Sequence, residues 1–200
     1  MKTILKYHIV LLAGVFCFFT GFAQEDFNNI RLGAGNITLD NKVYKKNANY
    51  VNFGFGPAYN PKRNAIEQSY GVSYNFLIKN IAFQVGYHSC SDDYILDRSL
   101  QKVNDLHLGG GIRWEKIKSN SAVLAGFSYA YGADEVVKND TSSYLGFTKF
   151  GLYVEYQYFY KIFFDIGVGA TAFISTNGAY QVLGIRLEFY FSQAYKRPYY

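Results

Sequence analysis

Eight stretches of this chain alternate large apolar residues with small or polar ones, and this alternation limits the fold more than any other feature. The last stretch, residues 180–191, shows it clearly. Leu183 and Leu187 share one phase, while Arg186 and Glu188 share the other. Because consecutive side chains of a strand point to opposite faces, each stretch predicts a β-strand with one apolar and one polar face.

The eight predicted strands and their connections indicate a closed barrel. The strands are expected at 49–59, 69–78, 81–89, 104–115, 121–132, 144–159, 162–174 and 180–191. Short connections at 79–80, 116–120 and 160–161 alternate with longer ones at 60–68, 90–103 and 133–143, and only 175–179 breaks the alternation. Single-chain bacterial barrels have even strand counts, short periplasmic turns and longer extracellular loops. We therefore predict an all-β fold, an eight-stranded antiparallel up-and-down transmembrane β-barrel with both termini in the periplasm.

Glycines on the polar phase favour a membrane barrel over a soluble one. A soluble barrel of the lipocalin type also has eight strands, but its polar phase faces water and should be rich in Lys, Glu, Thr and Ser. Here that phase holds eleven glycines: Gly54, Gly56, Gly71, Gly86, Gly109, Gly111, Gly126, Gly151, Gly167, Gly169 and Gly184. Glycine makes room where other groups approach closely. We expect this phase to face a narrow interior, where side chains of opposite walls meet, and the apolar phase to face lipid.

Aromatic residues make up 20% of the chain, and many tyrosines fall near the ends of predicted strands. Tyrosine and tryptophan favour membrane–water interfaces because their rings combine an apolar body with one polar group. We predict an aromatic girdle that contains Tyr59, Tyr70, Tyr87, Tyr129 and Tyr131 at the outer rim, and Trp114, Tyr156, Tyr158, Phe189 and Phe191 at the inner rim.

The N-terminus has the pattern of a secretory signal. Lys2 and Lys6 precede an apolar run at 9–22, and small residues precede a cleavage point after Ala23. This run is shorter than the roughly twenty residues that a membrane-spanning helix needs. The predicted segments are a signal peptide at 1–23, a periplasmic tail at 24–48, the barrel at 49–191 and a second periplasmic tail at 192–200. Residues 30–35 look strand-like, but a ninth strand would place the N-terminus outside the cell.

Charge and cysteine content exclude two further features. The formal net charge of +5 falls to +3 when Lys2 and Lys6 leave with the signal peptide, which gives no case for nucleic-acid binding. Cys90 is then the only cysteine left, so no internal disulfide is expected.

Two segments resemble a known family. The hairpin at 74–83 has a tight Lys79-Asn80 turn flanked by aromatic residues, and the closing strand at 184–191 ends in an aromatic residue. Over residues 49–191 the chain resembles the small outer-membrane β-barrel domains of the OmpA and OmpX type. This resemblance implies a Gram-negative outer membrane, contact with its lipid and lipopolysaccharide, and insertion by the barrel-insertion machinery, which reads final strands of this kind.

Charged residues on the polar phase are expected inside the barrel. They are Asp105, Arg113, Glu115, Lys149, Glu155, Asp165, Arg186 and Glu188. Isolated buried charges are very costly, so opposite charges in a narrow interior must pair or be hydrated. The interior of an eight-stranded barrel is just wide enough for its side chains. This favours a structural plug of ion pairs over a thin gated pore lined by the same residues.

His88 is the candidate for catalysis of the kind found in barrel enzymes that modify lipid A. A nucleophile and its base must lie within hydrogen-bond reach. However, His88 and its neighbour Ser89 fall on opposite faces of a regular strand, and Asp92 and Asp93 lie in the following loop. His88, Cys90, Asp92 and Asp93 also lack a known metal-ligand spacing.

We therefore predict a non-enzymatic outer-membrane β-barrel with a structural or interaction role in the cell envelope. No catalytic, cofactor or metal site is expected, and other envelope proteins are the expected partners besides lipid. The first alternative is a narrow, porin-like channel or an accessory subunit of an outer-membrane transport or secretion complex. The second is a lipid-modifying barrel enzyme.

Overall fold

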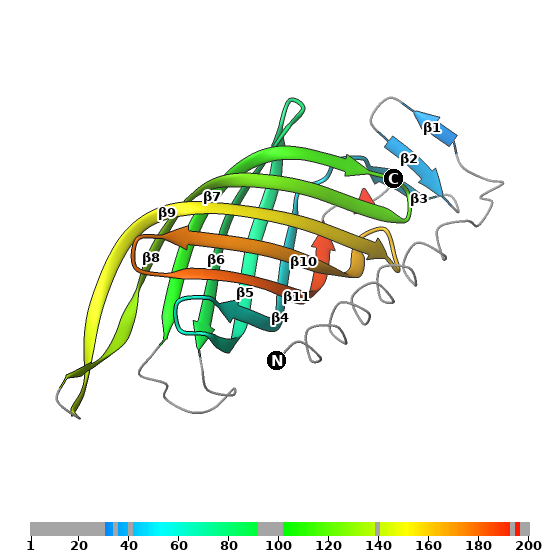
Figure 1. The fold of residues 1–200 in the computed structure, drawn as a ribbon. Coiled ribbons are helices and arrows are strands. Elements are labelled where there is room, and N and C mark those ends of the chain that lie inside the picture. Colours follow the sequence, from blue (N-terminus) through cyan, green and yellow to red (C-terminus); the bar gives the residue numbers. More distant parts are fainter. Residues whose placement is uncertain are drawn as a thin grey trace.

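The computed structural model describes residues 31–33, 36–39, 42–91, 102–138, 141–192 and 195–196. Eight long strands close into one barrel with antiparallel neighbours throughout (Figure 1). They are β4 (Tyr50–Asn60), β5 (Ala65–Ile78), β6 (Ile81–Ser91), β7 (Val103–Glu115), β8 (Ser119–Lys138), β9 (Thr141–Lys161), β10 (Ile166–Asn177) and β11 (Gln181–Ser192). β11 pairs with β4 and closes the ring, which confirms the predicted eight-stranded barrel. Within the described residues, no helix is long and apolar enough to cross a membrane.

The barrel has an exposed apolar wall and a buried polar interior. Along β9, Leu152 and Val154 are 58% and 48% exposed, whereas Glu155 is 1% exposed. Strand β7 shows the same contrast, with Leu108 exposed and Asp105 buried. A protein in water shows the opposite arrangement, but an apolar wall around a polar interior suits a barrel surrounded by hydrocarbon. The fold is that of a transmembrane β-barrel, and the predicted assignment of the two phases is confirmed.

The two ends of the barrel differ in their connections. The end that we call the short-turn end carries the connections 79–80, 116–118 and 162–165, and the opposite end, the hairpin end, carries 61–64 and 178–180. Two predicted long loops are wrong, since most of 60–68 and 133–143 is strand. The predicted strand at 162–174 also begins later, at Ile166. The loops were predicted to begin where the alternation of apolar residues ends. Hydrogen bonds between the backbones of neighbouring strands continue beyond that point.

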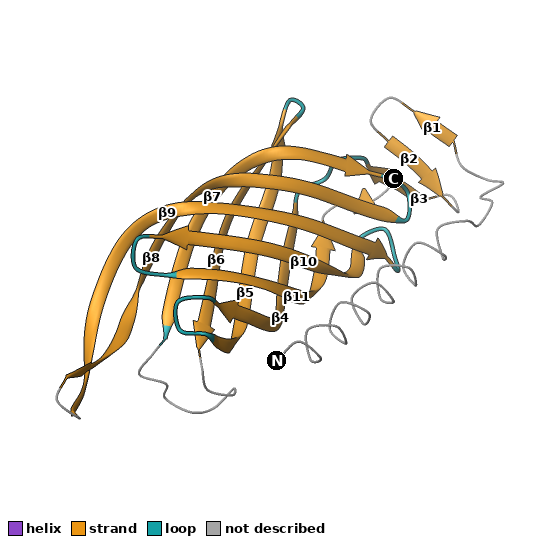
Figure 2. Cartoon of the chain, in the orientation of Figure 1, coloured by secondary structure: helices purple, strands orange, loops and turns teal. Residues whose placement is uncertain are grey.

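β8 and β9 extend beyond the closed barrel as a two-stranded ribbon. The pairing of β8 with β7 stops at Gly132, and that of β9 with β10 stops at Gly151. Farther out, β8 and β9 pair only with each other among the residues that the structure describes, up to Lys138 and Thr141. Figure 2 shows this pair reaching past the other strands. We refer to residues 133–138 and 141–146 as the projecting ribbon.

A small sheet lies at the short-turn end, outside the barrel. It consists of β1 (Arg31–Gly33), β2 (Asn36–Leu39), β3 (Lys42–Lys45) and β12 (Tyr195–Lys196), so chain segments from before and after the barrel pair with each other. Tyr44 stacks on Phe164 in the turn after β9, with ring centroids 4.5 Å apart. Residues 31–33 therefore form no ninth barrel strand, whereas the predicted signal peptide at 1–23 lies outside the described residues.

The interior glycines make room for two different kinds of neighbour. At Gly71 a Cβ would lie 2.6 Å from the guanidinium carbon of Arg186, so this glycine accommodates a side chain, as predicted. At Gly126 a Cβ would lie only 2.0 Å from the backbone oxygen of Leu108 on the adjacent strand. The prediction that these glycines make room for side chains of the opposite wall is thus incomplete. A narrow barrel also brings the backbone of the adjacent strand close to inward-facing positions.

Candidate functional site

A network of ion pairs and hydrogen bonds crosses the middle of the barrel. Arg186 donates from Nη2 to Glu155 and from Nε to Glu188, each at 3.0 Å. Gln84 donates to Glu155 at 2.9 Å, and Thr171 donates to Glu188 at 2.7 Å. We call these five buried residues the central network; they come from β6, β9, β10 and β11. Side chains that extend it are Asn52, Ser73, Asn75, Gln157 and Tyr50.

A second network fills the short-turn end. Arg113 Nη2 donates to Glu115 Oε2 at 3.0 Å, and Lys161 Nζ pairs with the other oxygen of that carboxylate. The side chains of all three are at most 1% exposed. Arg113 also donates to the backbone oxygen of Ala48 at 2.8 Å, and the backbone N–H of Asn47 donates to Glu115 at 2.5 Å. The segment before β4 therefore covers this mouth of the barrel, and we call Arg113, Glu115 and Lys161 the short-turn network.

A third network, which the sequence analysis missed, lies at the hairpin end. Glu67 accepts hydrogen bonds from Arg63 at 3.3 Å, Asn60 at 2.8 Å and Tyr180 at 2.9 Å. Arg63 and Glu67 fall within the predicted loop at 60–68. The sequence carries a signal for Glu67, because the inward phase of β5 runs backwards through Gly71 and Ser69 to that residue. We call Glu67, Arg63, Asn60 and Tyr180 the hairpin-end network.

The structure places six of the eight predicted interior charges inside the barrel. These are Asp105, Arg113, Glu115, Glu155, Arg186 and Glu188. Lys149 is exposed instead, because it lies on β9 before Gly151, where β10 no longer pairs and the wall is incomplete. Asp165 lies in the turn at 162–165, where its carboxylate accepts a hydrogen bond from Ser192 at 3.4 Å. The strand predicted at 162–174 begins only at Ile166, so Asp165 lies in the preceding turn and not on the inward face of the strand.

The ten predicted girdle residues all lie on the outer wall and are partly or fully exposed. They are Tyr59, Tyr70, Tyr87, Tyr129, Tyr131, Trp114, Tyr156, Tyr158, Phe189 and Phe191. Trp114 is 51% exposed, and Tyr129 packs against Phe150 with ring centroids 5.1 Å apart. Their position relative to a lipid surface remains a prediction.

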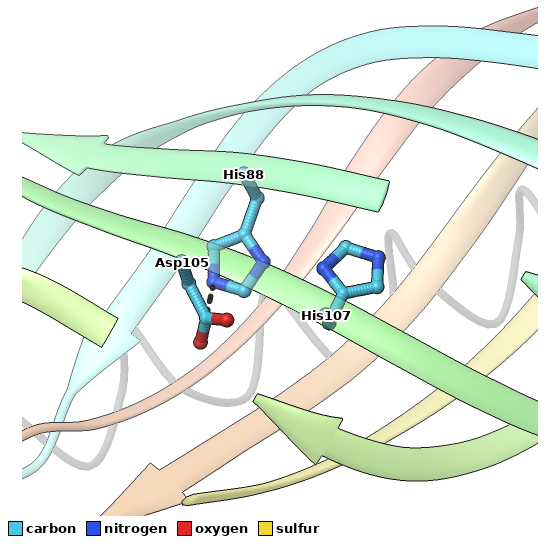
Figure 3. A group of neighbouring side chains, drawn as sticks. All are labelled: His88, Asp105 and His107. Carbon is cyan, nitrogen blue, oxygen red and sulfur yellow. Dashed lines mark ion pairs between the residues drawn. The ribbon is translucent and has the colours of Figure 1, made fainter. Parts of the chain in front are cut away.

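Two histidines and an aspartate meet between the central and hairpin-end networks. His88 on β6 is paired in register with Asp105 on β7, and His107 lies two residues farther along the same face of β7. Figure 3 shows the two imidazoles facing each other with the Asp105 carboxylate beside His88. The distance from His88 Nε2 to Asp105 Oδ2 is 3.6 Å, and all three side chains are at most 4% exposed. We call these residues the histidine–aspartate cluster.

The sequence analysis placed Asp105 inside the barrel but did not bring it together with the two histidines. It compared His88 with Asp92 and Asp93, which lie outside the described residues. The signal that was missed is the register, since Asp105 and His107 share one face of β7 and His88 lies opposite Asp105.

The geometry around His88 gives no support to Ser89 as a nucleophile. Ser89 is its neighbour on regular strand β6, where it pairs with Tyr70 and Asn104. Neighbouring strand residues point to opposite faces, so His88 and Ser89 do not converge.

The class that this architecture defines is the small eight-stranded transmembrane β-barrel of the outer-membrane type. Neisserial surface protein A matches over 72% of this chain and 95% of its own, at 14% identity and a TM-score of 0.54. The attachment invasion locus protein Ail of Yersinia pestis matches over 74% of this chain and 97% of its own, at 9% identity and a TM-score of 0.51. No protein-family model and no curated protein matches the sequence. At these identities the likeness concerns the fold.

Proposed function

We propose that this protein is a non-enzymatic β-barrel of the outer membrane, in which a plugged interior gives a rigid anchor for an interaction surface. The filling of the interior is the observation that carries the proposal. The short-turn and central networks join buried charges of opposite sign, and the hairpin-end network joins the buried Glu67 to Arg63, whose side chain is 14% exposed. Opening a path through them would leave charges unpaired in a narrow space, which is costly.

The projecting ribbon supports an interaction role. It continues past the closed wall, and among the described residues each of its strands has a strand partner on one side only. An unpaired strand edge can pair with an extended segment of another chain. Tyr144 and Leu145 on the ribbon are 44% and 67% exposed, so they offer apolar contacts beside that edge. We propose a segment of another envelope protein as the partner.

Orientation and lipid contacts are part of the same proposal. We place both termini and the short-turn end in the periplasm and the projecting ribbon outside the cell, as expected for short periplasmic turns. The exposed apolar wall would contact outer-membrane lipid and lipopolysaccharide. The final strand β11 ends with Phe189 and Phe191 on the outer wall, which suits recognition by the barrel-insertion machinery.

The fold comparisons are compatible with an envelope role. Neisserial surface protein A and the attachment invasion locus protein share the fold, and their names connect it with the surface and with attachment in those two proteins. The lipid-modifying alternative has weaker support, because His88 lies inside the barrel and Ser89 lies on the other face of its strand.

Planar-bilayer recording tests the plugged interior against the channel alternative. We expect the purified full-length protein to give no persistent stepwise current, because the three networks fill the interior. As a matched opening variant, Arg63→Ala, Arg113→Ala and Arg186→Ala combined would remove one cation from each network, and we expect intermittent current from it if it folds. Stable current steps from the wild-type protein would contradict the plug and support a channel.

A further inference from the structure

We propose that the histidine–aspartate cluster of His88, Asp105 and His107 binds one divalent transition-metal ion, with zinc as the best match. Imidazole nitrogens and carboxylate oxygens are common zinc ligands, and three protein ligands with an open fourth position are a known arrangement. This inference goes beyond the proposed function, because a plugged barrel can exist with or without a metal.

The first argument is that the donor atoms converge without using their hydrogen-bonding capacity on the protein. One ligand atom from each residue can be chosen so that all three lie within 4.8 Å of one another. Both ring nitrogens of His88, both of His107 and Oδ1 of Asp105 are buried, and none has a hydrogen-bond partner among the described residues. Buried polar atoms are normally satisfied. One ion held by all three side chains would satisfy three of these atoms together.

The second argument is that the required movement is small. Zinc lies about 2.0–2.2 Å from nitrogen and oxygen ligands, which puts tetrahedral ligand atoms about 3.4 Å apart. The cluster atoms therefore need to approach by roughly 1.4 Å or less, which side-chain rotation provides without moving a strand.

The third argument is that surrounding groups orient the ligands. Ser175 Oγ donates to Asp105 Oδ2 at 2.5 Å, which leaves Oδ1 for an ion. Tyr153 stacks on the His107 ring with centroids 4.0 Å apart, and Phe173 lies 5.2 Å from the His88 ring. A carboxylate that ligates a metal is typically hydrogen-bonded in this way, and the two aromatic rings limit the rotation of the imidazoles.

Gly86 provides the space for His107. It is paired with His107 in register, and a Cβ on Gly86 would lie 2.2 Å from His107 Nε2. Glycine at this position therefore lets the imidazole lie against β6, close to His88.

The fourth argument is the charge balance of the interior around the cluster. Asp105, Glu155 and Glu188 are three buried carboxylates, and Arg186 is the cation that pairs with two of them. With neutral imidazoles, the formal charge of this group is −2, which one divalent ion neutralises. Phe173 lies against both His88 and Arg186, with its ring 4.3 Å from the guanidinium carbon, so an aromatic ring packs between the cation and the cluster.

The test measures metal binding on the full-length protein with a purification tag that contains no histidine. The protein is refolded in detergent with Zn²⁺, dialysed, and assayed by mass-spectrometric metal analysis and by calorimetric titration after chelation. We expect one zinc per chain and a higher unfolding temperature with zinc. In His88→Gln/His107→Gln, we expect loss of stoichiometric zinc and of the shift. Ser69→Ala, which removes a buried hydroxyl at the hairpin end, is the matched control and should bind like wild type.

A positioning variant separates coordination from general packing. Ser175→Ala keeps all three ligands but removes the hydrogen bond to Asp105, so we expect zinc affinity to fall about 10- to 100-fold. Less than 0.2 zinc per wild-type chain, or one zinc per chain in the double-glutamine variant, would overturn the proposal.

Cobalt provides a readout that needs no variant, should the double-glutamine protein fail to fold. We expect wild type refolded with Co²⁺ to show the visible absorption of a four- or five-coordinate ion. A spectrum of hexaaqua cobalt alone would reject the site. Neither result bears on the current measurements, so the proposed function and this inference can fail separately.

Discussion

At the scale of single residues, the main feature is that ionised side chains are buried where a soluble protein would place apolar ones. Arg186 is 2% exposed and pairs with Glu155 and Glu188. Removing one partner of such a group leaves the others charged and unpaired, and this costs more than the intact group contributes.

We expect Arg186→Met to lower the free energy of unfolding by about 3–5 kcal/mol, because both carboxylates lose their buried cation. Urea unfolding of the protein in lipid vesicles measures the change. Lys149→Met is the control, since Lys149 is exposed and its replacement should change stability by no more than about 0.5 kcal/mol. Equal effects of the two substitutions would show that the ion pairs of Arg186 do not contribute more to the free energy of unfolding than an exposed charge does.

Two glycines of adjacent strands should respond differently to the same added methyl group. At Gly126 a Cβ would lie 2.0 Å from a backbone oxygen, so Gly126→Ala should destabilise by about 1–3 kcal/mol. At Gly110 the nearest atom would be 3.7 Å away, so Gly110→Ala should be neutral or stabilise by about 0.4–1 kcal/mol. The same vesicle unfolding assay applies. A harmless Gly126→Ala would mean that the backbones can separate there.

At the scale of elements, β8 and β9 have two parts with different roles. Their inner parts pair with β7 and β10 in the closed wall, while the strands of the projecting ribbon pair, among the described residues, with each other alone. A two-stranded ribbon is marginally stable by itself in water. The ribbon therefore adds a surface to the barrel and little to its stability.

Shortening the ribbon should leave the barrel folded. We expect removal of residues 135–144, with Asp134 joined to Leu145 through Asn-Gly, to change the free energy of unfolding by less than about 1 kcal/mol, because two-residue hairpins of this kind close readily. Heat-dependent gel migration and vesicle unfolding would check folding.

Photo-crosslinking from position 146 in intact cells should give a discrete adduct that disappears in the shortened variant. An adduct that persists would place the partner elsewhere.

At the scale of the whole molecule, the wall is the surface that determines where the protein can reside. Its exposed apolar residues surround a polar interior. A charged side chain on this wall is therefore expected to lower stability more in lipid than in water.

A charge on the middle of the wall should distinguish the two surroundings. We expect Leu108→Arg, at a position 56% exposed, to cost about 2–4 kcal/mol in vesicles, as arginine does at the midplane of a bilayer. Leu145→Arg is the control, because Leu145 is 67% exposed on the projecting ribbon, beyond the closed wall. If Leu108→Arg were as mild as Leu145→Arg, the wall would not face hydrocarbon.

Much of the barrel could be predicted from the sequence because the strand period of two is a local property. The outward face of Leu183 and Leu187 and the inward face of Arg186 can be read from one short segment. The number and order of the strands follow because the same pattern recurs eight times along the chain. The ends of strands were predicted less well. Glu67 and Lys149 were placed wrongly because backbone pairing begins and stops independently of the apolar pattern.

The amino-acid sequence by itself determined the all-β class, the number of barrel strands, and which side chains face outward, because alternation along a strand needs no distant contact. Only the tertiary structure decided which residues meet across the interior. Arg186 finds Glu155 through closure of the barrel, and His88 finds Asp105 and His107 through the register of β6 and β7. Register and closure join residues far apart in the chain, so no local pattern encodes these meetings.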